Sequence, residues 1–194
     1  MPSVDTVEKF MSLCTELGGS LDGSVGEVTC RVEPKTLLGI LGRIRELAEE
    51  HVRSEGYATA LTIGDEIVHI VIRPDGVELH FDLEVYVETD YSEEDLGKAC
   101  EAAYNAVTDA ILKSTHPAYM PELVDFADLD VRDCHDYQQD AGAVVICDIR
   151  TGALPPKEMW RIEKLLKAVL PSLNTVIEAM KSALEKKRGG GVNA

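Results

Sequence analysis

Residues 128–140, DLDVRDCHDYQQD, gather the side chains best suited to acid–base chemistry: five aspartates together with Cys134, His135 and Tyr137. Asp133 and His135 are two residues apart, so in an extended chain they share a side, where a carboxylate can fix a histidine tautomer. Cys134 then points the other way. We predict Asp133 and His135 as a general acid–base pair or as metal ligands, with Tyr137 or Cys134 assisting.

The segment that holds these residues, 114–140, is expected to be a long irregular loop, with prolines at 117 and 121. Loops longer than about 12–15 residues in a compact domain are usually functional or disordered. The same acids are also typical of a solvated loop with an exposed histidine. The interpretation therefore stays open between a site and a solvated acidic loop.

A second candidate site depends on how three strands pair. Gly64-Asp65 predicts a two-residue hairpin turn that pairs Leu61 with Val68. Matching the apolar faces of the next two strands sets His69 opposite His80, where Cβ atoms lie about 4.5–5.5 Å apart. We predict His69 and His80 as ligands of a divalent transition metal. A bulge at Gly76 would shift the register by one residue and separate the two histidines.

Apolar periodicity predicts the elements that position these residues. Helices are expected over residues 3–17, 37–55, 92–113 and, with a kink, 155–187; strands are expected over 24–33, 57–63, 66–72, 77–89 and 141–149. The three central strands follow one another closely, so they form an antiparallel meander, and a split βαβ-like rhythm surrounds it. The predicted fold class is α+β: a mainly antiparallel sheet covered by helices.

The domain organisation follows from the same pattern. Residues 1–154 are predicted to form the α+β domain, 155–188 a helical segment packed on it or on a partner, and 189–194 a disordered tail. Apolar residues in the helical segment recur with the spacing of a heptad seam: Ile162, Leu166, Val169, Leu173, Val176, Met180 and Ala183. Pro171 is expected to break or kink this helix near Val169.

The helical segment also suggests a partner. It is basic while the rest of the chain is acidic, and it carries more apolar residues than one narrow stripe needs. We therefore predict a homodimer through this segment, with the basic residues near the partner's acids. The alternative is a helix that covers its own core.

Composition limits the classes of function. The chain has 194 residues and a net charge of -16, so it repels phosphate backbones and anionic lipid, and neither nucleic acid nor a membrane is an expected partner. No stretch resembles a signal peptide or a membrane span. The five cysteines are odd in number and scattered singly, which predicts a cytoplasmic protein with reduced, mostly buried thiols.

Two functions remain as hypotheses. The first is a small acidic binding or assembly protein that forms homodimers. The second is an enzyme for a small molecule, with its acid–base site on the 114–140 loop, working with or without a metal. Because few basic residues lie outside the helices, a neutral or cationic ligand is favoured over a strongly anionic one.

Overall fold

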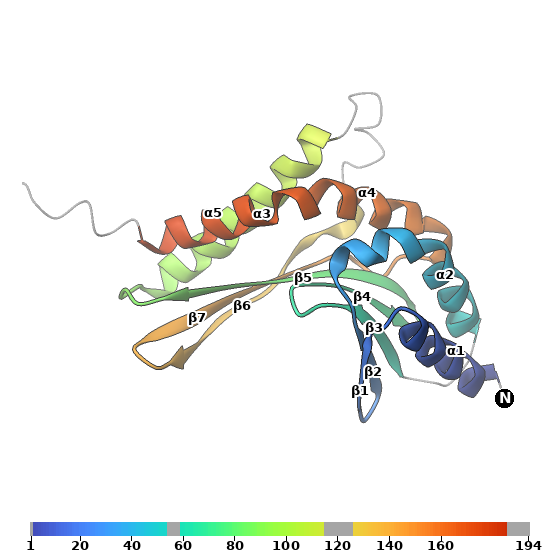
Figure 1. The fold of residues 1–194 in the computed structure, drawn as a ribbon. Coiled ribbons are helices and arrows are strands. Elements are labelled where there is room, and N and C mark those ends of the chain that lie inside the picture. Colours follow the sequence, from blue (N-terminus) through green and yellow to red (C-terminus); the bar gives the residue numbers. More distant parts are fainter. Residues whose placement is uncertain (1, 54–58, 115–125, 186–194) are drawn as a thin grey trace, which may run out of the picture. The chain divides into compact units, whose positions relative to one another are not determined.

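The structure is a computed structural model that describes residues 2–53, 59–114 and 126–185. Helices and strands alternate along the chain (Figure 1). In chain order they are α1 (Pro2–Glu16), β1 (Ser20–Ser24), β2 (Glu27–Arg31), α2 (Pro34–Arg53), β3 (Ala60–Gly64), β4 (Val68–Arg73), β5 (Gly76–Val87), α3 (Glu93–Ser114), η2 (Phe126–Asp128), β6 (Asp130–Gln139), β7 (Gly142–Arg150), η3 (Pro156–Glu158), α4 (Met159–Val169), η4 (Leu170–Ser172) and α5 (Leu173–Glu185). The predicted α+β class is confirmed.

The strands form one seven-stranded sheet in the order β1-β2-β3-β4-β5-β7-β6. The β1–β2, β3–β4 and β6–β7 pairs are antiparallel, whereas β2 and β3, which flank α2 in the chain, are parallel. The mainly antiparallel sheet and its central meander are therefore as predicted.

The chain divides into two compact units. The first contains residues 1–80, 126–128 and 151–167, and the second contains 81–125, 129–150 and 168–194. Strand β5 contributes to both. Buried and exposed side chains alternate along parts of β5. Val77, Leu79 and Phe81 on one face are fully buried, whereas Glu84 and Tyr86 on the opposite face are exposed.

Helix α3 in the second unit shows how sequence signals set a boundary. The Ser92 hydroxyl accepts a hydrogen bond from the Asp95 backbone N–H at 3.2 Å, and Asp95 Oδ2 accepts one from the Ser92 N–H at 2.9 Å. This is the predicted capping box. The buried stripe of α3 is rich in small residues, with Ala99, Cys100 and Ala103 at 0–2% exposed.

The C-terminal segment is helical and interrupted, as predicted from Pro171. Helix α4 ends at Val169, and the 3₁₀ turn Leu170–Ser172 joins it to α5. Most of the heptad seam is buried within the chain, while Leu173 and Ala183 are half-buried. In the second unit α5 packs along α3 (Figure 1).

The prediction of an irregular loop over 114–140 is wrong for residues 130–139. Residues 130–139 form strand β6, paired with β7 around the turn at Asp140-Ala141. Most of β6 is exposed, and aspartates are depleted in strands. Backbone hydrogen bonds to β7 stabilise the strand. The spacing of apolar side chains does not reveal such bonds, so the strand was not predicted. Residues 115–125 of the predicted loop lie outside the described residues, as does the tail predicted to be disordered, 189–194.

Two further predictions are corrected. Strand β1 was not expected, because its five residues are all exposed and show no apolar alternation. The turn after β3 is longer than the predicted two residues, since Gly64 pairs with His69 and Leu61 with Ile72, not Val68. The Asp65 carboxylate accepts the N–H groups of Ile67 and Val68, which stabilises the wider turn. The register moves by four residues, an even number, so the face assignments survive.

Within the described residues, no helix combines the length and apolar character needed to span a membrane.

Candidate metal centre

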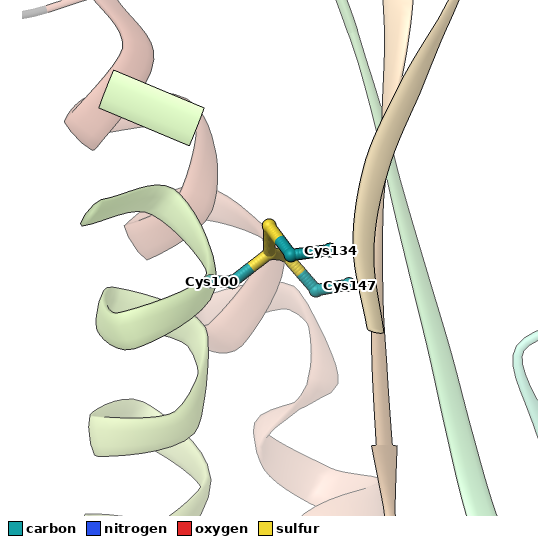
Figure 2. A group of neighbouring side chains, drawn as sticks. All are labelled: Cys100, Cys134 and Cys147. Carbon is teal, nitrogen blue, oxygen red and sulfur yellow. A yellow bond between two sulfur atoms is a disulfide. The ribbon is translucent and has the colours of Figure 1, made fainter. Parts of the chain in front are cut away.

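Three cysteines far apart in sequence meet in the second unit. Cys100 lies on α3, Cys134 on β6 and Cys147 on β7, and their side chains converge between helix and strands (Figure 2). All three sulfur atoms lie within 4.8 Å of one another. We call these residues the cysteine triad. Cys14, Cys30, Cys100 and Cys147 are buried, as predicted, but the predicted reduced state does not hold for Cys14 and Cys30, which form a disulfide. The meeting of three cysteines was not predicted from the sequence.

Local structure explains the convergence. The β6–β7 register places Cys134 directly opposite Cys147, and cross-strand neighbours project their side chains to the same face. On that face lies the small-residue stripe of α3, where Ala99 and Ala103 flank Cys100 and are fully buried. Short alanine side chains leave the Cys100 sulfur close to the sheet.

The connectivity of the triad limits its chemical states. Cys100 Sγ lies within bonding contact of both Cys134 Sγ and Cys147 Sγ. A cysteine sulfur forms only one disulfide, so the two bonds cannot exist together. The triad is therefore one disulfide beside a thiol, or three sulfurs around a shared centre.

Burial decides which charges the triad tolerates. Cys100 and Cys147 are 2% and 0% exposed, and Cys134 is partly exposed. The Cys134 thiol lies 3.3 Å from the Leu96 carbonyl oxygen, to which it can donate. Three uncompensated thiolates would be very costly in this setting, so the sulfurs must be protonated, oxidised or bound to a cation.

The donor set fits a soft metal ion. Thiolates select Zn²⁺, Cu⁺ and iron–sulfur clusters over hard cations. Among the described residues, the triad is the one group of three or more His, Cys, Asp or Glu side chains close enough to share an ion. With three protein ligands, tetrahedral Zn²⁺ would keep a fourth position for water or a small molecule.

The predicted acid–base residues lie on the other face of β6. Asp133 Oδ2 and His135 Nδ1 are 2.8 Å apart, and their side chains are 60% and 49% exposed. Tyr137, also exposed, shares their strand parity, whereas Cys134 belongs to the triad. The structure thus brings Asp133 and His135 together and separates Cys134 from them. Catalysis by these residues stays a prediction.

The predicted histidine pair lies in the first unit. The rings of His69 and His80 are 5.1 Å apart between centroids. His80 is 3% exposed, and its Nε2 lies 2.7 Å from Glu78 Oε2; this contact helps to keep the pKa of Glu78 below its usual value. His69 Nδ1 lies 3.0 Å from the Asp65 carbonyl oxygen. Metal binding by this pair stays a prediction.

A pair of carboxyl groups in the second unit was not predicted from the sequence. Asp82 on β5 neighbours Asp148 on β7, which accepts a hydrogen bond from Arg150 Nε at 2.7 Å. Burial, reinforced by Asp148, raises the pKa of Asp82 to about 7. A hydrogen bond between two carboxyl groups requires a shared proton, so Asp82 is the group that keeps it.

This proton predicts a pH-dependent stability. Folded Asp82 keeps its proton up to about pH 7, whereas the unfolded side chain releases it near its ordinary value of 3.8. Stability is therefore highest below pH 4 as far as this group is concerned, and it falls as pH rises from about 4 to about 7. Screening of this half-buried group reduces the expected loss to about 1–2 kcal/mol.

Urea unfolding at pH 5 and pH 8 measures this loss. Asp82→Asn is expected to remove most of the difference in stability between the two pH values, and Glu88→Gln, at an exposed position just after β5, is expected to leave it unchanged. An Asp82→Asn variant with the full wild-type pH dependence would show that another group is responsible.

Fold and site together define an α+β protein with a cysteine triad able to hold a metal ion. No protein-family model matches the chain, and searches of curated proteins and of solved structures likewise return no significant match. The functional argument therefore rests on the chemistry of the chain's own residues.

Proposed function

We propose that this chain binds a soft transition metal ion, with Zn²⁺ favoured, through Cys100, Cys134 and Cys147. The observation that carries the proposal is the meeting of three sulfurs from a helix and two strands within 4.8 Å. Such a site cannot pre-exist in the unfolded chain, so the free energy of metal binding also stabilises the fold.

Charge supports a divalent ion. Three thiolates with Zn²⁺ carry a net charge of -1, whereas with Cu⁺ they carry -2. The less charged complex costs less to bury at Cys100 and Cys147, which are almost fully buried. The partly exposed side of the site, at Cys134, is where water or a small neutral ligand would reach the fourth position. The proposed role is therefore a metal-binding protein. A small molecule that occupies the fourth position of the metal would be the ligand or substrate.

The test is a metal titration of reduced protein. The full chain, reduced and freed of metal under anaerobic conditions, is titrated with Zn²⁺ against a chromophoric chelator, and the complex is weighed by native mass spectrometry. We expect one Zn²⁺ per chain and, by X-ray absorption, sulfur neighbours at about 2.3 Å. Serine at any one triad position should weaken binding by about 100-fold or more, because a thiolate ligand is lost.

Matched variants locate the metal. Cys14→Ser/Cys30→Ser removes the other two cysteines and should leave binding unchanged, as should His80→Ala. If His80→Ala abolishes binding while the triad variants retain it, the ion belongs to the predicted His69–His80 pair. Reduced wild-type protein that binds no Zn²⁺, Co²⁺ or Cu⁺ ends the proposal.

We propose a cytoplasmic location and retain the homodimer as a second proposal. A net charge of -16 suits a salt-rich cytoplasm, and reducing conditions keep thiolate ligands available. The Cys14–Cys30 disulfide is the kind of bond that an oxidising compartment favours, so the redox state of the five cysteines in protein alkylated inside cells tests the location. Sedimentation at micromolar concentration tests the homodimer.

A further inference from the structure

The three sulfurs of the triad are not equivalent. Cys134 is partly exposed, whereas Cys100 and Cys147 are almost fully buried. Cys100 is the shared partner: its Cα lies 6.4 Å from that of Cys134 and 5.4 Å from that of Cys147. Both separations fall inside the range of about 4.4–6.8 Å that disulfides require. One buried cysteine can therefore bond either of two partners without a backbone rearrangement.

We infer that the metal-free triad is a thiol–disulfide relay that takes oxidising equivalents from a low-molecular-weight disulfide at Cys134 and deposits them in a buried Cys100–Cys147 bond. This activity goes beyond metal binding and needs no metal. It follows from three features: a partly exposed cysteine, a central sulfur in contact with two others, and a buried acceptor thiol.

The chemistry proceeds in three exchanges. The Cys134 thiolate attacks one sulfur of the external disulfide, forming a mixed disulfide and releasing one thiolate. The Cys100 thiolate then attacks Cys134 Sγ, forming Cys100–Cys134 and releasing the second external thiolate. Finally the Cys147 thiolate attacks Cys100 Sγ and displaces the Cys134 thiolate. The sum is two protein thiols and one external disulfide converted into one protein disulfide and two external thiols, so atoms and electrons balance.

Burial gives the relay its direction. Every resting state of the triad is uncharged, with thiols and a disulfide, so none incurs the cost of buried thiolates. A disulfide between Cys100 and Cys147 joins two almost fully buried residues, which external thiols reach poorly, whereas Cys100–Cys134 includes the partly exposed residue Cys134. The final exchange therefore moves the oxidation from an accessible bond to a protected one.

Disulfide mapping of trapped states tests the relay. Reduced full-length protein in chelator is exposed to oxidised glutathione, quenched by alkylation at intervals, and digested for mass spectrometry. Wild type should finish with Cys100 bonded to Cys147 and Cys134 alkylated. Cys147→Ser should stop at Cys100–Cys134, and Cys100→Ser should stop at a Cys134–glutathione mixed disulfide. Cys134→Ser should form Cys100–Cys147 about tenfold or more slowly, because its remaining triad thiols are buried.

Three results would overturn the inference: Cys134→Ser oxidised as fast as wild type, Cys134–Cys147 as the final bond of wild type, or Cys147→Ser that forms no Cys100–Cys134 bond. Circular dichroism of each variant confirms that the fold is intact, and the Cys14 and Cys30 peptides are followed separately in the same digest. Because this assay contains chelator and the metal titration contains reductant, either proposal can fail without the other.

Discussion

Replacing Leu166 by Asp is expected to unfold the protein. Leu166 lies on α4 and is 0% exposed. Burying a leucine contributes about 1.5–3 kcal/mol, and forcing a carboxylate into the same place adds a desolvation cost of several kcal/mol. Together these approach the whole stability of a typical domain, about 5–15 kcal/mol. Circular dichroism should show loss of cooperative urea unfolding in Leu166→Asp.

The same heptad seam supplies the control. Leu173→Asp changes the next but one seam position, which is half-buried, and is expected to cost only about 1–2 kcal/mol because water still reaches the carboxylate. A Leu166→Asp variant that folds and has the wild-type urea midpoint would contradict the burial of Leu166 within its own chain. The heptad seam would then be available to contact a partner. Equal losses of unfolding free energy in Leu166→Asp and Leu173→Asp would contradict the difference in burial between these two positions.

Removing the Cys14–Cys30 disulfide is expected to cost about 3 kcal/mol, the chain-entropy value for a closed loop of about 15 residues. The bond spans 16 residues, and it joins α1 to β2. Both sulfurs are fully buried, and a Cβ at Gly19 would lie within 3 Å of each of them. The disulfide therefore packs directly against the chain that it closes.

The double variant Cys14→Ser/Cys30→Ser measures this contribution by urea unfolding without reductant. Serine is slightly smaller than cysteine, so overpacking does not confuse the result. The matched control is Cys134→Ser, which replaces the partly exposed triad residue and keeps both Cys14–Cys30 and the Cys100–Cys147 pair. If the Cys14→Ser/Cys30→Ser variant unfolds at the wild-type urea midpoint, the disulfide does not contribute to the free energy of unfolding.

Helices and the long strand were predictable because their signals are local. The stripe of α2 and the alternation of β5 each appear within a few residues, and most of the buried side chains found there are those that the periodicity indicates. The exceptions are His51 and His80, which are buried, and Val52, which is exposed. Pro171 likewise predicted the break between α4 and α5, since a proline acts on its immediate neighbours. The net charge, the fold class and the Ser92–Asp95 cap belong to the same group.

The edge strands were not predictable in this way. β1 and most of β6 are exposed, so apolar periodicity is absent, and hydrogen bonds to a neighbouring strand define them instead. The register after β3 also escaped prediction, because Asp65 caps a wider turn through its side chain. The two missed strands share a cause: backbone pairing with a neighbouring strand leaves little trace in a strand's own side chains.

The cysteine triad lies between these cases. Cys134 and Cys147 are equidistant from the turn at Asp140-Ala141, so a hairpin there would have paired them, had residues 130–139 been recognised as a strand. No local pattern brings Cys100, 34 residues before Cys134, to the same place. By itself the sequence determined which residues are apolar, charged or thiol-bearing and which segments are helical. Only the packing of α3 on the β6–β7 hairpin decided that three thiols meet, because that contact depends on surfaces far apart in the chain.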